Sequence, residues 1–117
     1  MLSFNDYQNQ ALATDSYANS GKNIAVTDLA FLNKVLGLVG ESGEVAEKIK
    51  KILRNQDGKM TEDDKKEIIK ELGDVLWYMA VLSSYLGYDF ETVAKDNLTK
   101  LADRADRGVI KSKGDNR

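Results

Sequence analysis

The 117-residue sequence contains no cysteine, no histidine and no proline. Without cysteine and histidine, the chain has no disulfide bond, no thiolate or imidazole metal ligand, and neither a Ser-His-Asp triad nor a cysteine nucleophile. The lack of proline, together with abundant Ala, Leu, Glu and Lys, favours helices throughout. The composition therefore predicts a mostly helical protein in which oxygen atoms are the available metal ligands.

The sequence also has little net charge and no long apolar run. A formal net charge of -2 gives no global attraction to nucleic acid or to an anionic membrane. No stretch is apolar for long enough to span a bilayer, and the segment MLSFNDYQNQ lacks the basic and apolar blocks of a secretory signal. We therefore expect a cytoplasmic protein that has neither nucleic acid nor a membrane as its partner.

Hydrophobic residues make up 42% of the chain, which at this length suffices for one compact domain but not comfortably for two. Capping and turn residues divide this domain into four predicted helices. The helices run from Phe4 to about Tyr17, from Thr27 or Asp28 to Arg54, from Thr61 to near Gly87, and from just after Asp89 to near Arg107. The sequence thus predicts a single all-α domain, 1–117, with 108–117 as a basic C-terminal tail.

Two acidic pairs lie on the second and third predicted helices. Glu41 and Glu44 belong to GESGEVAE, and Glu71 and Asp74 belong to KELGD. A spacing of three residues places two side chains about 60° apart on a helix, and both pairs border an apolar stripe. If the two helices pack antiparallel, the four carboxylates converge, and their mutual repulsion requires a compensating cation.

The cation that suits these ligands is hard and divalent. Carboxylates and water favour Mg²⁺, with Mn²⁺ as a plausible substitute, over zinc or copper. A di-iron bundle is disfavoured because its usual Glu-x-x-His elements need histidine. A single ExxE pair is more often a solvated helix flank than a set of ligands. Two such pairs on adjoining helices favour a metal site.

In these two motifs, ESGEVAE and ELGD, the chain resembles the MazG-like all-alpha nucleoside triphosphate pyrophosphohydrolases, whose signature is EExxE, a spacer and ExxD. The resemblance covers most of the chain. It implies a four-helix core that uses Mg²⁺ to convert (deoxy)nucleoside triphosphates to monophosphates and pyrophosphate, as in clean-up of the nucleotide pool. Glu41, Glu44, Glu71 and Asp74 match the family's metal ligands. Gly40 stands where the family usually has its first Glu, which bears on a supporting hydrogen bond or a water contact.

The mechanism implied by the resemblance needs a base and phosphate contacts. Glu41 or Glu44 is our candidate for the carboxylate that accepts the proton of the attacking water. On the fourth predicted helix, Asn97, Lys100 and Arg104 recur at spacings of three and four and share a face. Spacing alone favours a solvated cationic helix end, whereas the resemblance implies that these three residues contact the substrate phosphates.

The resemblance further implies that the first helix borders the nucleotide pocket, which needs an apolar or aromatic wall with a few polar groups. We assign base and sugar contacts to five residues: Tyr7, Gln8, Ala11, Thr14 and Tyr78. Trp77 could add stacking, but its apolar neighbours favour a place in the core or at a subunit interface.

Three glycines lie beside the acidic motifs, and each costs roughly 1 kcal/mol of helix propensity relative to alanine. They are Gly40, Gly43 and Gly73. Close approach of the two helices and access to the metal site both explain residues without a side chain, and the sequence leaves both explanations open.

Extensive apolar surface on four helices predicts a homo-oligomer, either a tetramer built as a pair of dimers or a dimer, in which two subunits complete one pocket. Two alternatives remain open. A non-catalytic helical interaction or regulatory module would use the acids only for solubility. A member of the same family could instead act on phosphoribosyl-ATP, or strictly on dUTP or dCTP.

Overall fold

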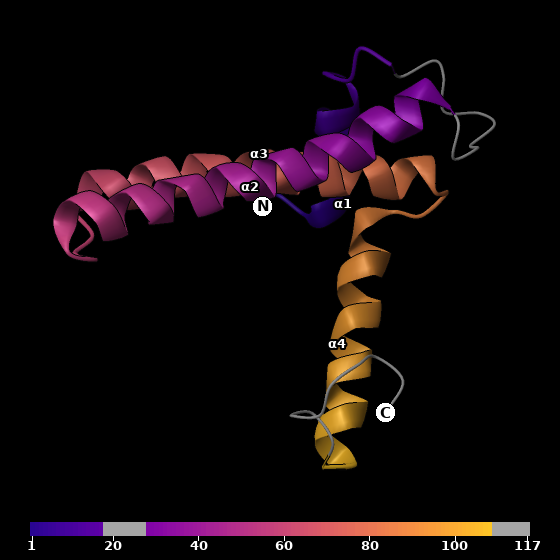
Figure 1. The fold of residues 1–117 in the computed structure, drawn as a ribbon. Coiled ribbons are helices and arrows are strands. Elements are labelled where there is room, and N and C mark those ends of the chain that lie inside the picture. Colours follow the sequence, from indigo (N-terminus) through magenta and orange to yellow (C-terminus); the bar gives the residue numbers. More distant parts are fainter. Residues whose placement is uncertain (18–27, 109–117) are drawn as a thin grey trace.

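The computed structural model describes residues 1–17 and 28–108, which form four α-helices and no strand (Figure 1). The helices are α1 (Phe4–Leu12), α2 (Leu29–Gln56), α3 (Glu62–Tyr85) and α4 (Phe90–Asp106). The all-α prediction is confirmed. The predicted start of the second helix at Thr27 and the residues 109–117 of the predicted basic tail lie outside the described residues.

The helices begin where side chains satisfy their free N–H groups. The Ser3 hydroxyl accepts the backbone N–H of Asp6 at 3.0 Å, and the Asp6 carboxylate accepts the N–H of Ser3, which completes a capping box. Thr61 and Asp64 form the same arrangement at the start of α3. These caps explain why the predicted starts of α1 and α3 agree with the structure within one residue.

The prediction that the first helix continues to about Tyr17 is wrong, because α1 ends at Leu12. Beyond this point, polar side chains bond to the local backbone. The Thr14 hydroxyl donates to the Ala11 carbonyl at 2.7 Å, and Asp15 Oδ1 accepts the backbone N–H of Tyr17 at 3.1 Å. Such side-chain bonds compete with the helical pattern and favour a turn.

Helices α2 and α3 run antiparallel and share the most extensive contact between any two helices (Figure 1). The chain reverses at Asp57 and Gly58, which have φ values of 52° and 76°. Both angles are left-handed, a conformation that glycine adopts without strain and that aspartate tolerates better than most residues. The predicted turn in NQDGK thus produces the hairpin that brings the two acidic motifs onto facing helices.

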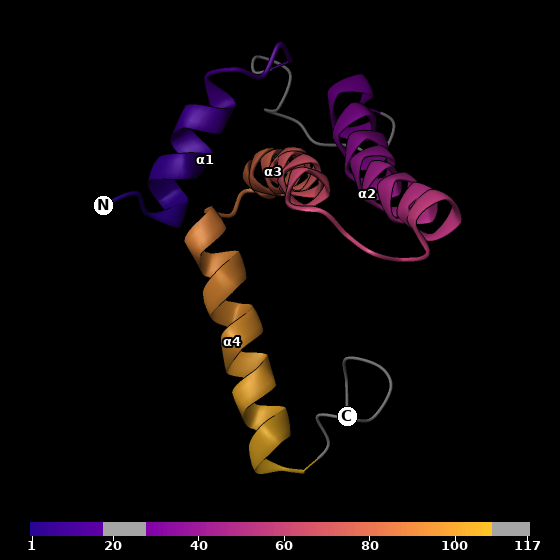
Figure 2. The ribbon, with the colours of Figure 1, turned by 90° about the vertical axis from the view of Figure 1, so that its left-hand side faces the viewer.

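A small core joins α1 to the end of this hairpin. Ala11, Ala30, Val81 and Tyr85 are buried together, and Trp77 packs against them. Helix α4 contacts α1 and α3 and extends away from the α2–α3 pair, as Figure 2 shows from the side. Phe90, at the start of α4, meets Phe4 edge to face with ring centroids 5.4 Å apart. The α4 helix is therefore anchored mainly at its first turn.

Gln8 fastens α1 to the end of α3 and the start of α4. Its Nε2 donates to the backbone oxygens of Ala80 at 3.0 Å and Tyr88 at 3.1 Å, and its Oε1 accepts the N–H of Phe90 at 3.1 Å. The side chain is buried. Its amide therefore satisfies two backbone groups that no helical ladder serves, the Tyr88 carbonyl and the Phe90 N–H, and adds a second bond to the Ala80 carbonyl inside α3.

No helix within the described part of the chain is long and apolar enough to cross a membrane.

Replacing Gln8 with Leu is expected to lower the free energy of unfolding by about 3 kcal/mol, because the Tyr88 carbonyl and the Phe90 N–H lose their partner in or near the core. Gln10→Leu changes an exposed position on the same helix, and should shift the free energy by less than about 0.5 kcal/mol. Urea unfolding followed by circular dichroism measures both variants. Equal effects at the two positions would contradict the role given to Gln8.

Candidate metal centre

Three of the four predicted carboxylates meet between α2 and α3. Glu41 comes from α2, whereas Glu71 and Asp74 come from adjacent turns of α3. One carboxylate oxygen from each residue lies within 4.8 Å of the other two. Glu41 and Glu71 are half-buried and Asp74 is exposed. We call these residues the acidic trio.

The acidic trio concentrates negative charge. Burial raises the pKa of Glu41, and the neighbouring carboxylates of Asp74 and Glu71 raise it further because they disfavour a third negative charge. Lys48 of α2 lies on one side of the trio, with its Nζ 3.5 Å from a carboxylate oxygen of Glu71. One lysine therefore offsets part of the charge of three acids.

The ligand atoms of the acidic trio suit a hard divalent cation, because all of them are carboxylate oxygens. Two oxygens bound to one Mg²⁺ at about 2.1 Å lie at most about 4.2 Å apart. The observed spacing of up to 4.8 Å needs only a small side-chain adjustment to reach this value. Waters would fill the remaining positions, as Mg²⁺ usually requires.

Glu44 lies outside the acidic trio. It is exposed on α2, one turn beyond Glu41, and its charge makes a minor contribution to the raised pKa of Glu41. The structure thus brings three predicted ligands together and leaves the fourth carboxylate at the edge of the group.

Open space surrounds the three glycines beside the motifs. A Cβ added at Gly40, Gly43 or Gly73 would meet no described atom within 4 Å, so close packing does not explain these glycines within one chain. The close approach occurs at Gly37, where an added Cβ would overlap the Tyr78 ring. The sequence reasoning missed this contact, although Gly37 lies one turn before Glu41 on α2.

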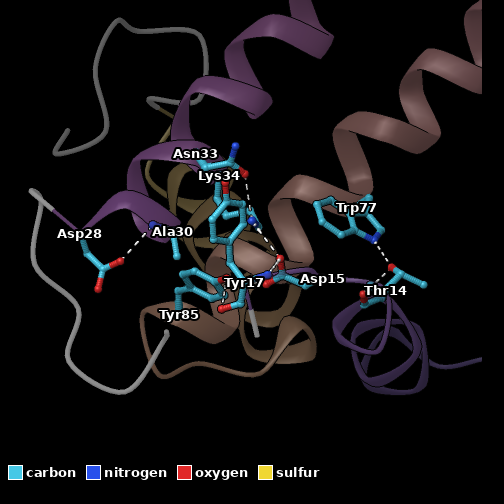
Figure 3. A network of polar contacts seen from close by, with 10 residues as sticks. Thr14, Asp15, Tyr17, Asp28, Ala30, Asn33, Lys34, Trp77 and Tyr85 are labelled. Atoms are coloured by element: carbon cyan, nitrogen blue, oxygen red, sulfur yellow. Dashed lines mark hydrogen bonds and ion pairs between the residues drawn. The ribbon is translucent and has the colours of Figure 1, made fainter. Parts of the chain in front are cut away.

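The acidic trio opens into a pocket of about 340 Å³ that is lined by Thr14, Glu41, Asp74, Trp77 and Tyr78. The Trp77 indole N–H donates to the Thr14 hydroxyl at 2.8 Å (Figure 3). The rings of Trp77 and Tyr78 meet edge to face at 4.9 Å. Trp77 thus touches the core and also lines the pocket, a role that its position one turn after Asp74 could have indicated.

The other residues predicted for the nucleotide pocket lie in two places. Burial, followed by the negative charge of Asp74, raises the pKa of Tyr7, so this phenol lies within electrostatic reach of the acidic trio. Tyr7 also lines an apolar pocket of about 300 Å³ with Phe4 and Leu76. Gln8 and Ala11 are buried in the core and do not line the pocket beside the acidic trio.

The residues predicted to contact phosphate all lie on α4. Asn97 and Lys100 line a separate hollow with Val93 and Asp96, and Arg104 is buried. Because α4 extends away from the α2–α3 pair (Figure 2), one chain does not bring this face to the acidic trio.

Comparison with known proteins gives two similarities. Residues 30–109 match the model of the MazG nucleotide pyrophosphohydrolase domain. The chain is 45% identical over 111 residues to the Gene 37 protein of Mycobacterium phage L5, covering 95% of this chain and 96% of that protein. No solved structure matches the chain.

The charge of the acidic trio generates a prediction about stability. Because the pKa of Glu41 is raised in the folded state, its ionisation costs stability above that pKa, and the cost disappears below the ordinary carboxyl value of about 4.3. Glu41→Gln should therefore raise the Tm of the metal-free protein at neutral pH by a few degrees and have little effect near pH 4. Differential scanning calorimetry across this pH range measures the change.

Glu47→Gln is the matched control, because Glu47 lies on the same helix and pairs with Lys50 at 3.8 Å instead of joining the trio. It should not raise the Tm. Added Mg²⁺ should stabilise the wild type more than Glu41→Gln, and equal stabilisation of both would rule Glu41 out as a ligand.

Proposed function

This chain belongs to the MazG nucleotide pyrophosphohydrolase family, and we propose that it hydrolyses nucleoside triphosphates to monophosphates and pyrophosphate with the help of Mg²⁺ or Mn²⁺. The observation that carries the proposal is the convergence of Glu41, Glu71 and Asp74 inside the matched domain. Oxygen ligands of this kind suit the metals that accompany phosphate chemistry.

The acidic trio would hold the metal, with Glu44 close enough along α2 to add a ligand or to act on water. A bound divalent ion would supply positive charge to the phosphate oxygens. Glu44 is exposed and stands apart from the trio, which favours it over Glu41 as the group that accepts a proton from the attacking water. Asp74, which faces the pocket, would orient the phosphate chain through its place in the trio.

The aromatic wall beside the trio supports a nucleotide as the substrate. Thr14, Trp77 and Tyr78 offer a hydroxyl and two rings next to Glu41 and Asp74. A base and sugar need this combination of apolar faces and a few polar atoms, while the phosphates need the metal. We propose that these three residues contact the nucleoside part, in a reaction that serves clean-up of the nucleotide pool.

We also propose that the active form is a homo-oligomer, a tetramer or a dimer. Large apolar side chains stay exposed on three helices of the single chain. Stable proteins usually cover such apolar surface. The exposed side chains include Leu36, Val39 and Leu53 on α2, Ile69, Leu72 and Met79 on α3, and Val93 and Leu98 on α4. Because α4 of one chain extends away from its own acidic trio, Asn97 and Lys100 would contact the phosphates bound to a second copy. Arg104 is buried in the single chain and would join them only if assembly exposes its side chain.

Release of pyrophosphate from a panel of canonical and modified nucleoside triphosphates tests the activity. Turnover should require Mg²⁺ or Mn²⁺ and disappear with a chelator. Glu71→Gln should lower kcat/KM by more than about 100-fold, because even residues that only support metal ligands are worth 10–100-fold. Circular dichroism should show unchanged helical content in this variant.

The same assay separates the proposal from the alternative of a non-catalytic interaction module. The specific observation that favours this alternative is Gly40, which leaves open space where the family usually has a Glu. Folded, metal-replete protein that releases no pyrophosphate from any nucleotide would refute the hydrolase proposal. Activity that survives both the chelator and Glu71→Gln would refute the metal assignment.

Complementation between subunits tests the proposed sharing of the site. Glu71→Gln and Lys100→Ala should each be nearly inactive alone. Co-expressed in equal amounts, they should recover about a quarter of wild-type activity for a dimer assembled at random, because half of the dimers contain one intact site. If Glu71 and Lys100 act within one chain, no intact site forms and no activity returns.

A further inference from the structure

A buried ion pair lies next to the candidate pocket. Lys34 of α2 places its Nζ 2.9 Å from Asp15 Oδ1, and only 1% of each side chain is exposed (Figure 3). Asp15 belongs to the segment that follows α1, so the ion pair joins this segment to α2. Isolated charges are costly to bury, and a pair is retained only when hydrogen bonds satisfy it well.

The surrounding side chains satisfy both charges. The Tyr85 hydroxyl of α3 donates to Asp15 Oδ2, and the backbone N–H of Tyr17 donates to Oδ1 at 3.1 Å. Burial raises the pKa of Asp15, but the hydrogen bonds from Tyr85 and Lys34 lower it by more. Lys34 also donates to Asn33 at 3.0 Å and lies 4.6 Å from the centre of the Tyr17 ring. The carboxylate is therefore held from α2, from α3 and from its own segment.

The residue before Asp15 is part of the pocket wall. Thr14 accepts the indole N–H of Trp77 at 2.8 Å, and both residues line the pocket with Glu41. The Lys34 ammonium also lies 5.8 Å from the centre of the Trp77 ring. Figure 3 shows the ion pair and the Thr14–Trp77 bond close together at this end of the molecule.

Lys34 and Glu41 share one side of α2. They are seven residues apart, which is about two turns of an α-helix, so their side chains project in nearly the same direction. Helix α2 thus carries Glu41 of the acidic trio. Two turns earlier it carries Lys34, whose ion pair with Asp15 anchors the segment after α1. Thr14 of this segment forms the pocket wall opposite the trio. The distance between Thr14 and the acidic trio therefore depends on the ion pair between Lys34 and Asp15.

We propose that Lys34 is a positioning residue for the nucleotide pocket: its ion pair with Asp15 holds Thr14 against Trp77 and so sets the wall that faces Glu41 and Asp74. This inference rests on the proposed function, because the wall positions the nucleoside part of the substrate. Lys34 itself touches neither substrate nor metal in this role.

Removing this ion pair should weaken substrate binding and leave the chemical step nearly unchanged. Lys34→Met alone would leave Asp15 as a buried charge without its cation, which destabilises a fold strongly. The informative variant is therefore Lys34→Met with Asp15→Asn, which removes both charges and leaves an amide oxygen that can accept from Tyr85. This double variant should raise KM roughly tenfold, the equivalent of about one lost contact, with kcat nearly unchanged.

Trp77 reports on the wall directly, because it is the only tryptophan in the chain. In metal-free and nucleotide-free protein, the double variant should shift the Trp77 emission to longer wavelength and make it easier to quench with acrylamide. Lys50→Met, which removes an exposed lysine of the same helix, is the matched control and should change neither the emission nor KM.

Tyr85→Phe keeps the test decisive if the double variant does not fold. It removes one donor to Asp15 and keeps the ion pair, so it should fold and cause smaller changes of the same kind in KM and quenching.

The proposal would be overturned if the folded double variant, or Tyr85→Phe where the double variant does not fold, showed the same acrylamide quenching and the same KM as the wild type. A fall in kcat at unchanged KM would also overturn it, because a purely structural role lowers the active fraction in this way. If the wild type hydrolyses no nucleotide, the proposed function fails, and the quenching comparison still decides whether Lys34 sets the wall.

Discussion

The antiparallel packing of α2 against α3 is the constraint on which the rest of the structure depends. A short reversal with left-handed angles at Asp57 and Gly58 aligns the two helices over many turns. Carboxylates that are 30 or more residues apart in the sequence then meet at one place, where Glu41 faces Glu71 and Asp74. The helices hold these charges together because their packing and their hydrogen bonds outweigh the local repulsion.

This repulsion links stability to function. In the metal-free protein, burial and the neighbouring acids Asp74 and Glu71 raise the pKa of Glu41, and Lys48 offsets only part of the negative charge. A divalent cation would relieve this repulsion by binding the folded state, which couples metal binding to folding. Sites that are preorganised for a charged ligand commonly reduce the stability of the empty protein in this way.

Two features of the single chain support the proposed assembly. Apolar side chains on α2, α3 and α4 remain exposed, and α4 carries its cationic face away from the acidic trio. Assembly with further copies would bury these apolar side chains. It would also bring the α4 face of one copy to the acidic trio of another, so the same contact would contribute to both stability and the site. The hydrogen-bonded core around Lys34 and Gln8 lies at the α1 end of the molecule.

Local patterns in the sequence determined the helices, their caps, the turn at Asp57 and the restriction to oxygen ligands, because capping and helical periodicity act over a few residues. They also placed Glu71 and Asp74 on one face of one helix. Only the tertiary structure decided that Glu44 stands apart from the trio. It alone joined Thr14 to Trp77, which lie 63 residues apart, and buried Lys34 with Asp15. Such contacts depend on how whole helices pack, and this depends on all the apolar and polar surfaces together instead of on any short pattern.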